Sequence, residues 1–352
     1  MAEYVQRELL QAPDSLVTNG KINFGTFRNQ FRRINYLDAD KPLGFPLPGP
    51  LLSARLKEWQ AFQLGDNRWF MLAVLYNAKV SALAQFIVYD KENKKKYAFE
   101  KILPSWQVKV PNSIWNSSQS YKDHECMVEI ISLLEKGRFY INIKLRDQKN
   151  LPDIEAHFEL FHDAGEVEPM VVSIPFGRNR GMYSHKCLMP MQGALSLGDE
   201  KIDFARRESF AFVDDHKGFY PYVMKYDWAT AAGFDDRGQL SGFNLTDNQS
   251  LDAEKYNENC LWINGKLHLL PPVKFSRPGG VEGEWLIRDN YGMVDLTFKP
   301  VSMGIINMNL LFLRVDYKGP FGYCNGFIRD SAGNKALINQ YFGMGEDKYI
   351  RG

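Results

Sequence analysis

The sequence has few cysteines and no closely spaced cysteine pair. Its four cysteines, Cys126, Cys187, Cys260 and Cys324, lie more than 60 residues apart. A zinc ribbon needs closely spaced thiolates, and a disulfide framework is typical of short, cysteine-rich secreted chains. Both are therefore excluded, and free buried thiols are expected.

Long apolar runs are also absent. No window approaches the roughly 18 uninterrupted apolar residues of a membrane-spanning helix, so no stable membrane insertion is expected. The first 16 residues include Glu3 and Glu8 and lack the apolar core of a signal peptide. These features predict a cytoplasmic protein.

The chain carries almost no net charge. Its 43 lysines and arginines balance 42 acids, which leaves a formal charge of +1 over 352 residues. A nucleic-acid-binding protein normally shows a strong basic excess. Nucleic acid is therefore not an expected partner.

Several catalytic and cofactor motifs are missing. The sequence contains no phosphate-binding loop, no glycine-rich dinucleotide fingerprint, no His-Glu-x-x-His and no Gly-x-Ser-x-Gly elbow. The six histidines are scattered, so a metal site would need ligands from distant strands. No cofactor and no metal site are predicted.

Alternating apolar residues and regularly spaced turns predict an all-β protein. The clearest hairpin joins residues 125–134 to 138–146 through Glu135-Lys136-Gly137, and residues 68–90 predict two buried strands about Asn77-Ala78. Asn264-Gly265 is typical of a two-residue turn with positive φ at both positions. No stretch keeps a helical apolar period, so helices should be few and short.

Residues 163–169 (DAGEVEP) are acidic and contain glycine and proline, which is typical of a linker. We therefore place a domain boundary within 163–180. It divides the chain into an N-terminal β domain, residues 1–170 with an irregular first segment, and a C-terminal β domain, residues 171–352.

The richest concentration of polar and aromatic groups is at 210–233, FAFVDDHKGFYPYVMKYDWATAAG. If this stretch begins with a strand, alternation places Phe210, Phe212, Asp214 and His216 on one face and Asp215 on the other. Burial would raise the pKa of Asp214, whereas a nearby imidazolium would lower it. Asp214 and His216 are therefore the candidate catalytic residues for acid/base chemistry. Alternatively, Asp214 only caps backbone amides and His216 lies at a rim.

Neighbouring segments supply candidates for ligand contact. The aromatic rings can form a wall against a ligand or can simply belong to the core. The Asn264-Gly265 turn would make Glu258 and His268 point apart, so only one of them can line a given cavity. The candidate ligand-binding residues are Lys217, Tyr222, Tyr226, Trp228, Asn244, Glu258 and His268.

The central motif resembles the DUF2804 proteins, a bacterial family of unknown function. Members carry a pattern similar to Leu-Asp-Trp-Gly-Arg-Gly-x-Trp-Pro-Tyr, followed by an aromatic-rich segment and small residues. The corresponding segments here are Val213 to Tyr222, Tyr226-Asp227-Trp228 and Ala231-Ala232-Gly233. The similarity extends to Lys186-Cys187, Gly242-Phe243-Asn244, Glu258-Asn259, Trp262, His268 and Val294 to Phe298. In the motif itself, Trp-Gly-Arg is replaced by Asp215-His216-Lys217.

That family is in turn distantly similar to double-calycin proteins such as carotenoid hydratases and tocopherol cyclases. The resemblance implies two lipocalin-like (calycin-type) antiparallel barrels or sandwiches packed together. It also implies an apolar small-molecule ligand, such as a lipid or an isoprenoid, and hydratase- or cyclase-like acid/base chemistry. A lipid carrier without catalysis and a carbohydrate- or protein-binding β module are the alternatives.

Overall fold

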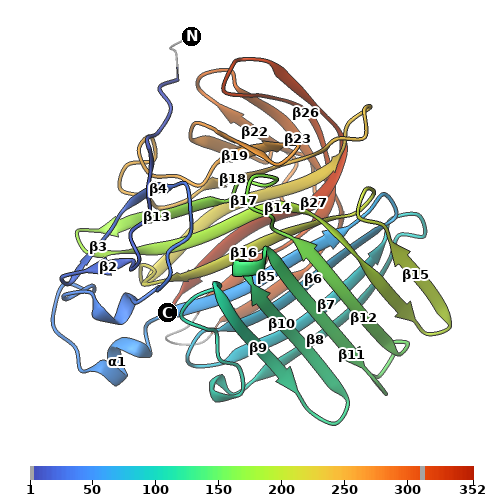
Figure 1. Cartoon of the computed structure of the whole chain (residues 1–352), viewed down its shortest axis with the longest axis horizontal. Helices are drawn as coiled ribbons and strands as arrows, with labels where there is room; N and C mark the ends of the chain where they lie inside the picture. Colours follow the sequence, from blue (N-terminus) through green and yellow to red (C-terminus); the bar gives the residue numbers. More distant parts are fainter. Residues whose placement is uncertain (1–3, 310–313) are drawn as a thin grey trace.

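The chain folds into two large, curled sheets whose strands are almost all antiparallel (Figure 1). The computed structural model describes residues 4–309 and 314–352. The larger sheet has 14 strands and the smaller has 11. The predicted all-β class is confirmed, and each of the two curled antiparallel sheets forms a half-barrel.

The larger sheet follows the order β8-β7-β6-β5-β16-β14-β12-β11-β10-β9. These strands are β5 (Lys57–Gly65), β6 (Trp69–Asn77), β7 (Ala82–Asp90), β8 (Lys95–Leu103), β9 (Asn116–Lys122), β10 (Cys126–Leu133), β11 (Arg138–Leu145), β12 (Ile154–Phe161), β14 (Arg180–Leu197) and β16 (Phe210–Gly218). Four further strands join it, namely β1 (Leu9–Leu10), β4 (Gly25–Phe27), β13 (Met170–Gly177) and β15 (Glu200–Phe204).

The smaller sheet follows the order β20-β19-β18-β17-β27-β26-β23-β22-β21, and β25 adds to β27 and carries β24. Its strands are β17 (Val223–Phe234), β18 (Leu240–Asp247), β19 (Cys260–Ile263), β20 (Lys266–Leu269), β21 (Val273–Ser276), β22 (Trp285–Asp289), β23 (Val294–Ser302), β24 (Ile305–Asn309), β25 (Arg314–Lys318), β26 (Phe321–Arg329) and β27 (Lys335–Arg351).

Each sheet curls around its own apolar core. In the larger sheet, β6 and β7 contact β9 and β10 from the opposite end of the strand order, and in the smaller sheet β18 contacts β21. A third apolar cluster lies between the sheets, where Phe212 of β16 meets Trp262 of β19 edge to face at 5.2 Å between ring centroids. Aromatic pairs in this arrangement stabilise beyond their buried area. The two half-barrels therefore share a continuous apolar interface.

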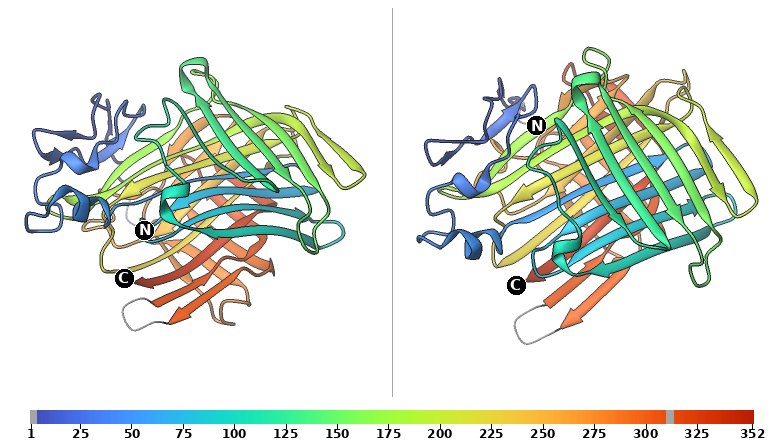
Figure 2. Two further views of the ribbon diagram at one scale, coloured as in Figure 1. Left: turned by 90° about the horizontal axis from the view of Figure 1, so that it is seen from below. Right: turned by 60° about the horizontal axis from the view of Figure 1, so that its bottom comes forward.

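Residues 11–56 lie at one end of the larger sheet (Figure 2). They contain a small β2 (Val17–Thr18) and β3 (Lys21–Ile22) hairpin, the short helix α1 (Gly49–Ser53) and the 3-10 turn η1 (Tyr36–Asp38). Two more 3-10 turns, η2 (Ser105–Gln107) and η3 (Leu134–Lys136), lie in loops. Among the described residues, no helix has the length and apolar character needed to cross a bilayer.

The turn chemistry predicted several local features correctly. Strands β10 and β11 form the predicted hairpin around Gly137, and β6 and β7 are the predicted buried pair. Asn264 and Gly265 have φ values of 48° and 78°, as a two-residue turn requires. A Cβ on Gly265 would lie 1.8 Å from the carbonyl oxygen of Glu166, so glycine is needed for close approach as well as for conformation.

The chain passes from the larger sheet to the smaller between β16 and β17. Residues 163–180 instead join β12 to β13 and β14, which all belong to the larger sheet. The linker-like composition of this segment therefore reflects a connection within one sheet. The division into domains at residue 170 stays a prediction, and it does not coincide with the change of sheet.

Candidate functional site

Strand β16 places Asp214 and His216 at the interface between the two sheets. Phe210 and Phe212 belong to the inter-sheet cluster, whereas Ala211 and Val213 belong to the core inside the larger sheet. Asp214 and His216 follow Phe212 at two-residue steps, so they share its face. The side chains of β16 therefore alternate as the sequence predicts.

The strands beside β16 bring further polar groups to the same face. Lys186 and Ser184 of β14 lie directly opposite Asp214 and His216. On the other side, Trp59 of β5 lies opposite His216. Directly opposed side chains in an antiparallel pair are close enough to interact. The register of three adjacent strands thus builds one half of the site.

A buried ionic cluster joins these groups to the smaller sheet. The Lys186 ammonium pairs with the Asp214 carboxylate and lies 3.7 Å from Glu258 Oε2. His216 Nε2 lies 2.9 Å from Asp214 Oδ1 and 3.7 Å from Glu258 Oε2. The Lys186 side chain is 1% exposed and that of Asp214 is 12% exposed. Two carboxylates, one ammonium and one imidazole therefore share a small, mostly dry space.

The charges in this cluster control its protonation. Burial alone would raise the pKa of Asp214, but His216 and Lys186 hold that pKa well below its usual range. Burial would lower the pKa of Lys186, but the attraction of Asp214 and Glu258 raises it overall. Asp214 is thus ionised and Lys186 is charged at neutral pH. The Lys186 ammonium also lies 3.1 Å from His216 Nε2.

Aromatic side chains fix the imidazole ring. Trp59 stacks on His216 with ring centroids 4.5 Å apart and an interplanar angle of 9°. The Trp59 Nε1–H donates to Asp214 Oδ2 at 3.2 Å. The hydroxyl of Tyr220 lies 3.1 Å from His216 Nδ1, and Ser184 Oγ lies 3.0 Å from Nε2. Both ring nitrogens therefore have oriented partners.

The smaller sheet positions Glu258, which precedes β19. Asn244 Nδ2 donates to the Glu258 carbonyl oxygen at 2.7 Å, and Trp228 Nε1 donates to Asn244 Oδ1 at 2.6 Å. Thr246 Oγ1 donates to Glu258 Oε1 at 2.9 Å. Within the described part of the chain, the buried Oε2 has no hydrogen-bond partner. One oxygen of Glu258 is thus anchored, and the other faces the cluster without a donor.

Half-buried residues lie beside the cluster, between the two sheets. Trp59 is half-buried, as is Ala61, which pairs with Asp214. Across the interface, Lys348 Nζ lies 5.5 Å from the Trp59 ring and 5.0 Å from the Tyr226 ring. The Lys348 ammonium also donates to Tyr226 Oη at 2.8 Å. Trp59, Tyr226 and Lys348 form a rim, so partly exposed aromatic surface lies next to the buried Asp214 carboxylate.

The structure gathers five of the nine candidate residues, namely Asp214, His216, Trp228, Asn244 and Glu258. Tyr226 lies at the rim just described. Lys217 points to the opposite face of β16 and pairs with Glu58 at 2.8 Å, because adjacent residues of a strand alternate. Tyr222 is 51% exposed in the connection between the sheets. The side chain of His268 contacts Ser331 Oγ at 2.8 Å, and its hairpin partner is Leu261, so it points away from Glu258 as the turn predicts.

Residue-by-residue reasoning missed Lys186, Trp59, Ser184, Tyr220 and Thr246. Lys186 had a detectable signal, because a lysine directly before the apolar run Cys187-Leu188-Met189 must be paired if that segment is buried. Trp59 had no such signal in the sequence. Its position above His216 depends on the pairing of β5 with β16, and the two strands are about 155 residues apart in sequence. Among the described residues, no group of three or more His, Cys, Asp and Glu side chains is arranged to hold a metal ion.

The fold is similar to that of solved double-barrel proteins. Kievitone hydratase from Nectria haematococca superposes with a TM-score of 0.52 at 10% identity, covering 84% of this chain and 87% of that one. CghA in complex with Sch210972 gives a TM-score of 0.50 at 9% identity, with 84% and 88% covered. At this identity the likeness concerns the fold.

Comparison by sequence is more specific about the family. No curated protein matches the chain. The family model described as a domain of unknown function, DUF2804, matches residues 6–351, nearly the whole length. The chain therefore belongs to the DUF2804 family.

Proposed function

We propose that the protein binds an apolar small molecule between its two half-barrels and transfers a proton to or from it. The observation that carries this proposal is the close contact of His216 Nε2 with the Asp214 carboxylate, at 2.9 Å beneath a stacked indole. The Lys186 ammonium lies 3.1 Å and Glu258 Oε2 3.7 Å from the same nitrogen. Such a desolvated group with specific charge partners is typical of an acid/base site. The aromatic rim supports an apolar ligand.

The ion pairs favour His216 over Asp214 as the group that carries the proton. A carboxyl whose pKa is held far below its usual range is a weak base and is rarely protonated at neutral pH. An ionised Asp214 instead stabilises the imidazolium and orients its Nε2–H. Tyr220, on Nδ1, fixes the ring from the other side.

The surrounding rings suit a positively charged intermediate. Trp59 covers the imidazole, and the Lys186 ammonium already lies 5.3 Å from the Trp228 ring centroid. Aromatic faces stabilise cations through their quadrupole. We therefore infer that His216 protonates a carbon–carbon double bond of an isoprenoid-like ligand, as in hydration or cyclisation. Burial of Trp228 argues against a carbohydrate- or protein-binding module with an open aromatic surface.

Proton transfer can be tested by deuterium incorporation. The purified protein is incubated in D2O with geraniol, farnesol and geranylgeraniol, and the recovered ligand is analysed by mass spectrometry. Deuterium enters the ligand when its double bond accepts a deuteron from His216 and the cation then returns a proton. Asp214→Asn and His216→Gln should each lower the incorporation rate by about 100-fold or more, because general acid–base catalysis contributes that much.

Measuring the ligand affinity of the same two variants distinguishes a catalyst from a lipid carrier. Their affinity for the alcohol that exchanges should stay within about threefold, because neither substitution removes the apolar interface. His268→Gln, outside the site, is the matched control and should exchange at the normal rate. Binding without exchange by the unmodified protein would indicate a carrier, and normal exchange in His216→Gln would refute the assigned role.

A further inference from the structure

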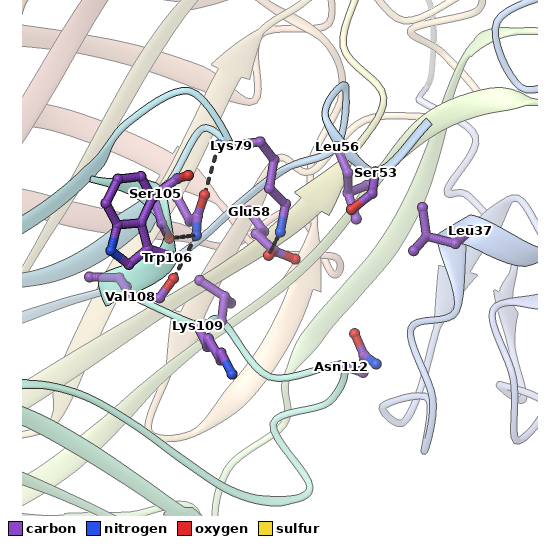
Figure 3. A pocket seen from close by; sticks show the side chains of 12 residues that line it. Leu37, Ser53, Leu56, Glu58, Lys79, Ser105, Trp106, Val108, Lys109 and Asn112 are labelled. Carbon is purple, nitrogen blue, oxygen red and sulfur yellow. Dashed lines mark hydrogen bonds and ion pairs between the residues drawn. The ribbon is translucent and has the colours of Figure 1, made fainter. Parts of the chain in front are cut away.

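A cavity of about 370 Å³ lies at the end of the larger sheet, near η2 and the N-terminal segment. Figure 3 shows Glu58, Lys79 and Lys109 on its wall, with Trp106 at one side. The cavity is on the opposite face of β16 from the Asp214 and His216 cluster, because Lys217, which points away from that cluster, reaches Glu58 here. It is thus a separate space from the proposed acid/base site.

The charges around this cavity do not balance. Glu58 is the one carboxylate among the lining residues, and its buried side chain pairs with both Lys79 and Lys217. Lys217 also donates to the carbonyl of Pro111 at 2.9 Å, so its ammonium is well satisfied. Lys109 pairs with no carboxylate in the described ranges 4–309 and 314–352. Two ammonium groups therefore pair with Glu58, and Lys109 adds a third positive charge to the cavity lining.

Lys79 and Lys109 keep donors for a ligand. The Lys79 side chain is 23% exposed, and Glu58 is the one carboxylate with which it pairs in the described part of the chain. Both lysines line the cavity, whereas Lys217 lies behind Glu58. An anion placed between Lys79 and Lys109 would meet two ammonium groups next to a low-dielectric wall, where charge-assisted hydrogen bonds are strong.

The rest of the wall is mixed, with Ser53, Asn77, Ser105 and Asn112 beside the apolar residues, and part of it is held in place. Leu56, Val108 and Val110 are buried lining residues, and Trp106 is 76% exposed at the rim. Asn77 Nδ2 donates to the carbonyl oxygens of Ser105 at 2.8 Å and Val108 at 2.5 Å, which ties this segment to β6. A wall fixed in this way loses little freedom when a ligand binds.

We propose that this cavity binds a small amphiphilic anion, a carboxylate or sulfonate attached to an apolar body. The anionic group contacts Lys79 and Lys109, and the apolar body lies against Leu56 and Val108 with Trp106 over it. The cavity volume is at the lower end of the range for small-molecule sites, which suits a ligand of one or two rings. The proposal is independent of the acid/base function and assigns Lys217 to this site, where it supports Glu58.

Two fluorescent probes that differ only in charge test the proposal. 8-Anilinonaphthalene-1-sulfonate carries the anion, and N-phenyl-1-naphthylamine has the same apolar body without it. Lys109→Gln should weaken binding of the sulfonate by about tenfold, as expected for loss of a charge-assisted contact, and should leave binding of the uncharged probe within about twofold. Trp106→Ala should weaken both probes.

A matched control keeps the result specific. Lys136→Gln removes an exposed lysine on η3 that is not part of the cavity lining, and this variant should bind both probes normally. Unchanged sulfonate affinity in Lys109→Gln, or an equal loss for both probes, would overturn the proposal.

Discussion

Replacing Lys186 with methionine should lower the free energy of unfolding by about 3–5 kcal/mol, the cost typical of breaking a buried ion pair from one side. Lys186 is the fully buried ammonium between Asp214 and Glu258. Without it, two carboxylates remain in a mostly desolvated space, with His216 as the one neighbouring group that can become cationic. The measurement is urea unfolding at pH 7, read as a lower midpoint at an unchanged slope.

A second substitution shows whether the loss comes from uncompensated charge. Lys186→Met combined with Asp214→Asn removes one of the stranded carboxylates and should recover part of the lost stability, so the two effects should not add. Lys201→Met, on the exposed edge strand β15, is the control and should stay within about 0.5 kcal/mol of the unmodified protein. An equally unstable double variant would show that packing, and not charge, explains the loss.

Asp215→Asn should stabilise the protein at pH 8 by up to about 4 kcal/mol, which corresponds to three pKa units. Asp215 lies on the face of β16 opposite Asp214, inside the larger sheet, and burial raises its pKa to about 7 although Lys217 opposes the shift. The folded protein therefore holds a proton that the unfolded chain releases near pH 4. Because the folded state keeps this proton, the free energy of unfolding falls as the pH rises from 4 to 7. Above pH 7 the whole cost of burying the ionised carboxylate remains. Asparagine removes the penalty.

The pH dependence is the diagnostic feature. Unfolding of the unmodified protein and of Asp215→Asn is compared at pH 4, 6 and 8, and the gap between them should grow from near zero to its full size. Asp203→Asn replaces an exposed carboxylate on β15 and should show no such growth. A gap of the same size at pH 4 and pH 8 would mean that Asp215 does not retain its proton on folding.

Alternation along β16 was predictable because it is a local property. Successive side chains of any strand point to opposite faces, so the pairing of Asp214 with His216 and the separation from Asp215 follow from one segment. The Asn264-Gly265 turn similarly determined that Glu258 and His268 point apart. The same alternation places Lys217 on the face opposite Asp214, where it pairs with Glu58.

The partners of His216 could not be predicted in this way. Trp59, Lys186 and Glu258 come from three different segments, and their meeting depends on strand order and on how the two sheets pack. Residues 163–169, despite their linker-like composition, connect strands of one sheet. Glycine, proline and acids mark a turn, but they do not say whether the next strand returns to the same sheet.

By itself, the sequence determined that this is a strand-rich protein with few helices, with its turns at identifiable positions and a mixed polar and aromatic face on 210–216. These features depend on backbone preferences and on side-chain periodicity over a few residues. Only the tertiary structure decided that Lys186 and Glu258 complete the ionic cluster and that Lys217 belongs to a second cavity. Hydrogen-bond and packing energies fall off within a few ångströms, so they depend on which distant strands become neighbours.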